Sequence, residues 1–423
     1  MAALKSLGLL LFALLGGPLF VLIGAAAILG FLQAGVDLTA IIIEFNRLTN
    51  SPTLITMPLF TFAGYILAES HAPKRLIRLA EAWFGWIPGG LAIVVLVACA
   101  FFTTFTGASG VTIVALGGLM LPVLMKNYSE RFSLGLITSS GSLGLLFPPS
   151  LPLILYGIVA SAPIDKLFLA GIIPGMVLIL VLSSYGSIWS ARIKVPRTPF
   201  RLKEALLSLW KTKWEALLPF MLLAAIYSGT TTVAEAATLT VIYVLIVEML
   251  LYRDIKVPML SGIVKESMVL VGAILIILGV ALGFTNFLVD QEIPMKALEF
   301  IQEHIHSKIV FLLAINAFLL IVGCLMDIFS AIIVVVPLIS PIAAAFGIDP
   351  IHLGIIFLTN LEIGYLTPPV GLNLFISSLK FDKSIVRVYV SVLPFIALLL
   401  LSLLLITYVP DLSLWLPRLF GGP

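Results

Sequence analysis

The sequence contains very little charge. Only 24 Lys and Arg and 21 Asp and Glu occur among its 423 residues, or 11% of the chain, whereas charged residues make up about 25% of an ordinary soluble domain. Hydrophobic residues make up 61%, and the mean hydropathy is +1.19. A soluble globular domain is therefore excluded, and a net charge of only +3 gives no basic surface for a nucleic acid.

Cysteine and histidine are also scarce. The two cysteines, Cys99 and Cys324, lie inside apolar segments, where a free thiol behaves as a small hydrophobic group and forms no disulfide framework. The four histidines show no metal-ligand spacing such as H-E-x-x-H. The sequence contains no Asp-rich magnesium motif or cluster of catalytic groups either, so an enzyme is not expected.

The sequence contains several long apolar runs. Each is close to the roughly 20 residues that an α-helix needs to cross the hydrocarbon core of a membrane, and none alternates like a barrel strand. The first is too long for a signal peptide and lacks a cleavage site, so it is interpreted as a span. The sequence predicts an all-α polytopic membrane protein. The runs cover residues 7–31, 166–190, 233–252, 267–289 and 388–409.

The distribution of basic residues predicts which loops are cytoplasmic. Short cytoplasmic loops collect Lys and Arg, and the strongest basic stretch is the connector 191–213. We therefore expect this connector to be cytoplasmic. It divides the chain into two halves, residues 1–190 and 214–423.

One pattern occurs once in each half. In the first half, the apolar stretch 89–124 is interrupted by Thr-Gly-Ala-Ser-Gly, and a second segment, 130–160, contains a Pro-Pro pair. In the second half, the stretch 309–345 is interrupted near an Asp, and the segment 350–379 again contains Pro-Pro. Broken helices at matching places in two halves of a membrane protein indicate a transporter's binding site.

The two copies are predicted to have opposite orientations. Basic residues flank 89–124 on both sides, whereas acidic residues predominate before 309–345 and no basic residue follows it closely. Each stretch is therefore expected to enter and leave the membrane on one side, from opposite sides in the two halves. The sequence predicts two inverted-topology repeats, each with a re-entrant helical hairpin and a discontinuous helix.

A hairpin tip cannot face lipid, because its unpaired backbone groups would cost several kcal/mol each. If each tip faces the helix break of its own repeat, free carbonyls, hydroxyls and helix C-termini gather there, and these suit a dehydrated Na⁺. Helix N-termini at the same place suit an anion. We predict at least two Na⁺ sites, formed by Thr106, Gly107, Ser109, Gly144, Phe147, Gly323, Met326, Asp327, Gly364 and Thr367. The predicted substrate-binding residues are Ser109, Ser150, Asp327 and Asn373.

Other interpretations of these residues stay open. Asp327 could act only as a helix cap, although intramembrane carboxylates are usually functional. The Ser and Thr hydroxyls could simply bond helix carbonyls, and the Pro-Pro pairs could be kinks. Glu235 and Glu248 are expected to cap or pair structurally.

Taken together, the motifs resemble the large membrane subunit of the tripartite ATP-independent periplasmic (TRAP) transporters, the DctM or SiaM type. The resemblance covers essentially the whole chain. The motifs that carry it are FNR (45–47), PLF (58–60), AG (63–64), TGASG (106–110), LFPPSLP (146–152), GTTTVAEAA (229–237), MD (326–327) and TPPVGLN (367–373).

The resemblance implies Na⁺-coupled uptake of a small organic anion, a carboxylate or a sulfonate, across the bacterial inner membrane. It also implies an elevator mechanism with a scaffold and a moving transport domain. A periplasmic substrate-binding protein (P type) would deliver the cargo. A small membrane subunit (Q type) is expected as a separate chain, because no extra helices precede residue 1.

A stand-alone Na⁺/anion carrier of the related citrate, dicarboxylate or arsenite type remains the alternative, since it would share inverted hairpins but need no binding protein. A membrane enzyme is more distant, and a plain channel fits opposed hairpins poorly. No set of side chains in the sequence distinguishes one organic anion from another.

Overall fold

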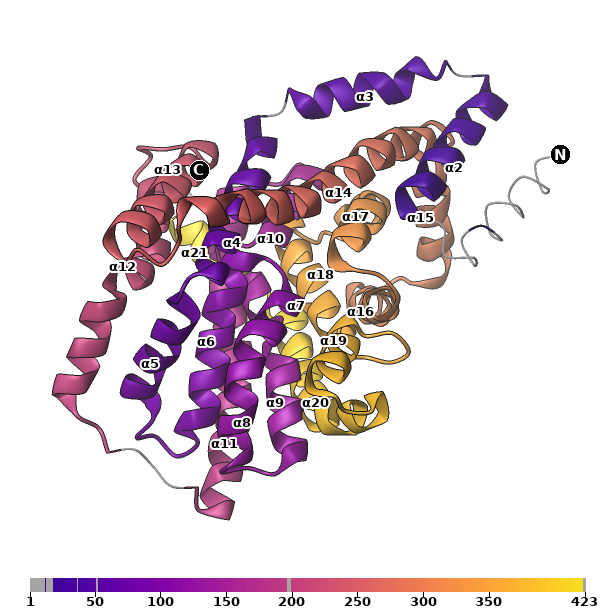
Figure 1. Ribbon diagram of the computed structural model, residues 1–423. Helices are drawn as coiled ribbons and strands as arrows, with labels where there is room; N and C mark the ends of the chain where they lie inside the picture. The colour runs from indigo at the N-terminus through magenta and orange to yellow at the C-terminus, as the bar shows by residue number, and fades with distance from the viewer. Residues whose placement is uncertain (1–11, 13–17, 36, 51, 196–198, 421–423) are drawn as a thin grey trace.

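The computed structural model of the chain describes residues 12, 18–35, 37–50, 52–195 and 199–420, and every regular element in this part is helical (Figure 1). Six of the described helices are long and apolar enough to cross a membrane. The number rises to eight if two bent helix pairs each count as one span. The predicted all-α, multi-pass fold class is confirmed.

Four of the five apolar runs form long helices at the predicted places. They are α11 (Ile164–Ile193), α13 (Val233–Leu245) continued by the π-helical η4 (Ile246–Leu251), α14 (Val257–Asp290) and α20 (Ile385–Tyr408). The first run corresponds to α2 (Leu19–Ala34), and the rest of residues 7–31 lies outside the described residues apart from Phe12 and Pro18.

The connector is largely helical. Within it, α11 ends at Ile193 and α12 (Leu202–Tyr227) begins at Leu202. Residues 196–198 lie outside the described part of the chain. The capping box that precedes α13 explains Glu235: its carboxylate accepts a hydrogen bond from the Thr232 backbone N–H at 2.7 Å, and the Thr232 hydroxyl accepts one from the Glu235 N–H.

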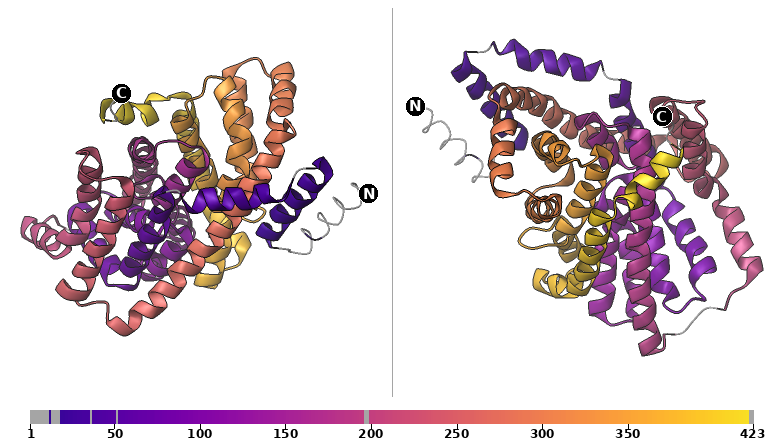
Figure 2. Two further views of the ribbon diagram at one scale, coloured as in Figure 1. Left: turned by 90° about the horizontal axis from the view of Figure 1, so that it is seen from above. Right: turned by 180° about the vertical axis from the view of Figure 1, so that it is seen from behind.

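Shorter helices complete the chain. In the first half they are α3 (Thr39–Thr49), η1 (Pro52–Ile55), α4 (Thr56–Glu69) and α5 (Ala72–Phe84), and in the second half α15 (Ile293–His304) and α21 (Asp411–Phe420). Both α5 and α15 are amphipathic, and each directly precedes one of the interrupted stretches. Figure 2 shows α2 and α3 at one edge of the molecule, beside α14.

Each interrupted stretch forms two helical arms joined by two residues. In the first half, α6 (Gly90–Thr106) is joined through Gly107 and Ala108 to a second arm. In the second half, α16 (Lys308–Leu325) is joined through Met326 and Asp327 to α17 (Ile328–Ala345). The second arm of the first hairpin consists of α7 (Ser109–Thr112), the π-helical η2 (Ile113–Gly117) and α8 (Gly118–Met125).

Each Pro-Pro segment is a broken helix. In the first half, α9 (Glu130–Ser140) and η3 (Leu143–Leu146) are followed by α10 (Leu151–Val159), and the chain bends by 47° between the two parts. In the second half, α18 (Pro350–Gly364) is separated from α19 (Leu372–Phe381) by seven irregular residues, 365–371. A cis Pro-Pro peptide bond lies in each break.

The two halves pack into one another. Helix α17 of the second hairpin packs on α10 of the first half, and α18 packs on η3, while α19 and α20 pack on α9. One buried apolar cluster includes residues from both halves. A smaller one lies among α4, α12, α13 and α14, at the side of the molecule where α12 and α13 are drawn in Figure 1.

A buried ion-pair cluster joins α5 to α12 and η4, on the side of the molecule that contains the smaller apolar cluster. The Arg75 guanidinium bonds Glu215 of α12, Glu248 of η4 at 3.0 Å and Asp254 at 2.6 Å. It also lies 3.9 Å from the centre of the Tyr252 ring. The predicted structural pairing of Glu248 is confirmed. Burial raises the pKa of Asp254, but hydrogen bonds from Arg75 and His71 outweigh this effect and leave the pKa below its ordinary value.

Removing Arg75 tests the importance of this cluster. The Glu215 and Glu248 side chains are 1% and 0% exposed, and a buried charge without its partner is costly. We expect Arg75→Gln to lower the free energy of unfolding by about 3–5 kcal/mol. The exposed pair Arg201–Glu204 provides the control, because Arg201→Gln should cost at most about 1 kcal/mol. Thermal unfolding in detergent measures both, and equal losses would contradict the cluster's role.

Candidate functional site

The first hairpin tip lies against the broken helix of its own half. The Thr103 hydroxyl is 2.8 Å from the carbonyl oxygen of Gly141 and 2.7 Å from the Thr112 hydroxyl. The Thr104 hydroxyl donates to the Ala100 carbonyl of its own helix at 2.8 Å and lies 3.3 Å from the carbonyl oxygen of Gly144. The Thr103 hydroxyl therefore contacts the Gly141 carbonyl at the helix break, whereas the Gly144 carbonyl also accepts the Phe147 N–H at 3.1 Å.

Glycine makes this approach possible. A Cβ at Gly144 would lie 2.2 Å from the carbonyl oxygen of Ala100 and 2.6 Å from the Thr104 nitrogen. No side chain fits there, so the backbones of α6 and η3 are in direct contact. This places carbonyl oxygens of the hairpin and of the helix break within a few ångströms of one another.

The second half contains the equivalent approach. A Cβ at Gly364 would lie 2.5 Å from the Cα of Gly323, so α16 and α18 also meet backbone to backbone. The Gly371 N–H donates to the Cys324 carbonyl at 3.3 Å, and the Ile328 N–H donates to the Tyr365 hydroxyl at 2.7 Å. In both halves, the hairpin is thus bonded to the break of its own repeat.

The two halves meet at the first tip. The Ser109 hydroxyl donates to the Asn373 side-chain oxygen at 2.7 Å, across 264 positions of sequence. Next to it, Gly110 lies against Ile376 of α19, and Gly107 lies against Leu151 at the start of α10. The first tip therefore lies between its own broken helix and that of the other half.

Several buried polar atoms at these breaks have no hydrogen-bond partner among the described residues. They are Ser139 Oγ, Ser150 Oγ, Asn373 Nδ2 and Glu362 Oε1. Buried polar groups are nearly always paired, so unpaired ones in a native protein require an explanation such as a bound ion or molecule. Ser150 and Asn373 are both 0% exposed.

The predicted site residues fall into two groups. Those of the first half, together with Asn373, lie in one buried region formed by the first tip and both breaks. Gly323 and Gly364 touch each other at the second crossing, which is also near Met326 and Asp327. The Thr367 hydroxyl donates to the Ile363 carbonyl at 2.9 Å, which is the local helix bond that the sequence left open.

The two tips differ in exposure. Thr106 and Ser109 are buried, whereas Asp327 and residues 368–370 of the second break are exposed. Asp327 caps α17: its Oδ1 accepts hydrogen bonds from the Phe329 and Ser330 N–H groups, each at 3.0 Å. Its carboxylate also bonds the Ser330 hydroxyl. The capping role is present, and a role in cargo or ion binding stays a prediction.

Three residues that make contacts at the hairpin tips and breaks were not predicted from the sequence. Thr103 and Thr104 were visible as two adjacent hydroxyl residues inside an apolar run. Tyr365 gave no such signal, because nothing in the sequence indicates that its hydroxyl reaches the second tip. Within the described residues, His, Cys, Asp and Glu form no group of three that could hold a metal ion.

Comparison with known proteins identifies the family of the chain. Residues 6–412 match the family described as "Tripartite ATP-independent periplasmic transporter, DctM component". The C4-dicarboxylate TRAP transporter large permease protein DctM of Vibrio cholerae is 35% identical, with 97% of this chain and 96% of that protein covered.

Two further likenesses are informative. The isethionate TRAP transporter permease protein DctMQ of Oleidesulfovibrio alaskensis is 34% identical over 97% of this chain and 65% of its own length. The crystal structure of the Alcanivorax borkumensis YdaH transporter, with a TM-score of 0.64 at 14% identity, covers 91% of this chain and 89% of that one. At this identity, the likeness concerns the fold alone. The chain belongs to the DctM family of large permease subunits of tripartite ATP-independent periplasmic transporters.

Proposed function

We propose that the protein carries out Na⁺-coupled uptake of a small organic anion, a carboxylate or a sulfonate, across the bacterial inner membrane. The observation that carries the proposal is the pair of glycine crossings, where a hairpin contacts a helix break in each half. Such crossings bring backbone carbonyls and hydroxyls together, with the Asp327 carboxylate near the second one, and these groups suit Na⁺. One Na⁺ is assigned to each crossing.

The cargo is assigned to the region between the crossings, where Ser109 meets Asn373. Unpaired Ser150 Oγ and Asn373 Nδ2 atoms and the N-terminus of α10 are suited to bind an anion there. Asp327 at the second tip would contact the same cargo or its ion. The relatives named for C4-dicarboxylates and isethionate support a small carboxylate or sulfonate.

An elevator movement is proposed for the hairpins and broken helices. The amphipathic helices α5 and α15 occupy equivalent positions, each immediately before a hairpin. They would link a moving part, built from the hairpins and breaks, to a scaffold that includes α12, α13 and α14. A Q-type small subunit would brace that scaffold, and a P-type binding protein would deliver the cargo. Membership of a tripartite family supports this composition over the stand-alone carrier.

The Na⁺ assignment predicts a specific dependence of uptake. Proteoliposomes that contain the chain, a small membrane subunit and a cargo-loaded binding protein should take up cargo only with external Na⁺. Thr106→Ala together with Thr367→Ala should raise the Na⁺ concentration for half-maximal uptake roughly fivefold, because each of the two Na⁺ sites loses one ligand group worth about 1 kcal/mol.

Thr238→Ala is the matched control for this experiment. Its hydroxyl also bonds a helix carbonyl, that of Ala234, but on an exposed face of α13. The control should leave the Na⁺ dependence unchanged. The ion assignment would be contradicted if uptake were as fast without Na⁺ as with it. It would also be contradicted if the double variant needed the same Na⁺ concentration as the unmodified chain.

The cargo assignment predicts that Ser109 and Asn373 act as a pair. Ser109→Ala and Asn373→Ala should each raise the KM of uptake by about five- to tenfold, which corresponds to one lost hydrogen bond. Because the residues share that bond, the double variant should be less impaired than the product of the two single effects.

The pair Thr138 and Ser377 is the control for the loss of any hydrogen bond between the two halves, whether or not it lies at the cargo site. Their hydroxyls bond at 2.9 Å between α9 and α19 and are fully buried, but neither is a predicted cargo residue. Thr138→Ala and Ser377→Ala should lower thermal stability and leave KM unchanged. A comparable rise in KM for both pairs would mean that Ser109 and Asn373 are only structural.

A further inference from the structure

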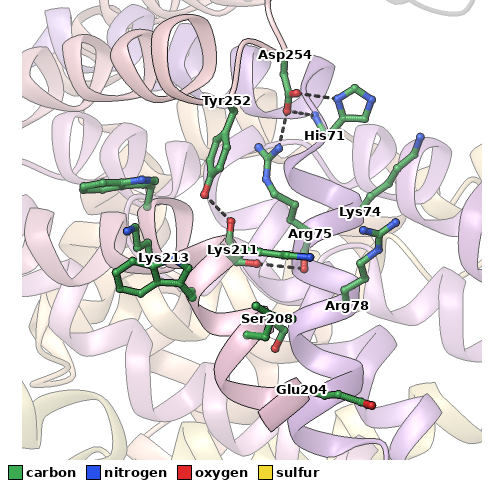
Figure 3. Close-up of a pocket in the computed structure, with 14 residues that line it drawn as sticks. His71, Lys74, Arg75, Arg78, Glu204, Ser208, Lys211, Lys213, Tyr252 and Asp254 are labelled. Atoms are coloured by element: carbon green, nitrogen blue, oxygen red, sulfur yellow. Dashed lines mark hydrogen bonds and ion pairs between the residues drawn. The ribbon is translucent and has the colours of Figure 1, made fainter.

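A groove that the transport mechanism does not use lies between α5 and α12. Its main cavity has a volume of about 680 Å³ and is lined by two helical faces and the segment that contains Tyr252 and Asp254 (Figure 3). A second cavity of about 320 Å³ shares Arg78, Glu204 and Ser208 with the first. The two therefore form one continuous groove along this pair of helices.

The groove has unpaired positive charge at its rim. Lys74 and Arg78 are one helical turn apart on α5, so they project from the same face. Lys211 projects from α12 into the same cavity. Within the described part of the chain, none of these three has a carboxylate within 4.0 Å, whereas the acidic Glu204 is paired with Arg201.

The floor of the groove does not cancel this charge. Arg75 and the carboxylates of Glu215, Glu248 and Asp254 are already bound to one another. The rim also contains Lys213, which lies 3.4 Å from the centre of the Trp210 ring. Four cations at the rim exceed the two net negative charges of the floor and the single carboxylate of Glu81 in the second cavity, so the groove as a whole attracts an anion.

Apolar surface lies beside the charge. Leu207 and Trp210, which line the groove, are 49% and 68% exposed. A separate cleft of about 220 Å³ between α5, α6 and Leu209 is lined by apolar residues alone, including Trp83 and Phe101. A ligand with a charged head and an apolar tail matches both surfaces, whereas a purely polar anion matches only one.

We infer that this groove binds the phosphate headgroup of an anionic phospholipid. The basic connector and the basic loops on either side of the first hairpin indicate the cytoplasmic face, where the membrane leaflet carries anionic lipid. Lys74, Arg78 and Lys211 bind the headgroup phosphate. Trp210 lies at the level of the headgroups, and the lipid joins α5 to α12.

Native mass spectrometry of the full chain in detergent tests this inference. The protein is titrated separately with phosphatidylglycerol and with phosphatidylcholine, and inorganic phosphate is added at millimolar concentration in a third series. We expect one tightly bound phosphatidylglycerol and weaker phosphatidylcholine binding. The variant Lys74→Gln/Arg78→Gln/Lys211→Gln should bind phosphatidylglycerol roughly a hundredfold more weakly, because the loss of each basic residue weakens binding to an anionic headgroup by roughly fivefold.

A control variant removes the same charge elsewhere. Lys126→Gln/Arg192→Gln/Lys194→Gln changes three exposed residues of the same predicted face that do not line the groove. It should bind phosphatidylglycerol like the unmodified chain. The charge-retaining variant Lys74→Arg/Lys211→Arg should do so too.

Three results would overturn the inference: unchanged binding in the groove variant, an equal loss in the control variant, or displacement of phosphatidylglycerol by inorganic phosphate. The last would assign the site to free phosphate. If the triple groove variant does not fold, Lys74→Gln and Lys211→Gln singly replace it, each with an expected loss of roughly fivefold.

Discussion

Backbone groups at a helix break have no water to bind inside a membrane, and the packing of the protein must supply their partners. Here the partners come from the hairpin of the same half. The Thr103 hydroxyl lies 2.8 Å from the Gly141 carbonyl oxygen in the first half, and the Cys324 carbonyl accepts the Gly371 N–H in the second. Because side chains would block these bonds, glycine is required at the crossings, and the four broken segments are held together as one central region.

The same constraint explains why this region can be functional. A carbonyl has two lone pairs and can bind a cation while it accepts one hydrogen bond. Unpaired buried atoms, such as those of Ser150 and Asn373, add groups that a cargo can satisfy. Thr106 and Ser109 at the first tip are buried, whereas Asp327 at the second tip is exposed, and only the second tip contains a carboxylate.

The sequence predicted the local features of this arrangement, and the long-range contacts needed the structure. The interruptions at Gly107 and Asp327 and the Pro-Pro breaks follow from residue types that cannot continue an ordinary helix. The bond between Ser109 and Asn373 joins positions 264 residues apart, and its partners were predicted without their pairing. Arg75 could not be matched with Glu215 and Glu248, because no local pattern specifies which distant carboxylate a basic residue meets.

The central claim is that each hairpin and its own break form a Na⁺ site at a glycine crossing. The most direct measurement is a high-resolution experimental structure of the assembled transporter in saturating Na⁺, compared with one in K⁺. The account predicts Na⁺-dependent density at both crossings, coordinated by carbonyl oxygens beside Gly144 and beside Gly323 and Gly364. Crossings without ion density in Na⁺, or with Na⁺ bound elsewhere in the protein, would contradict it.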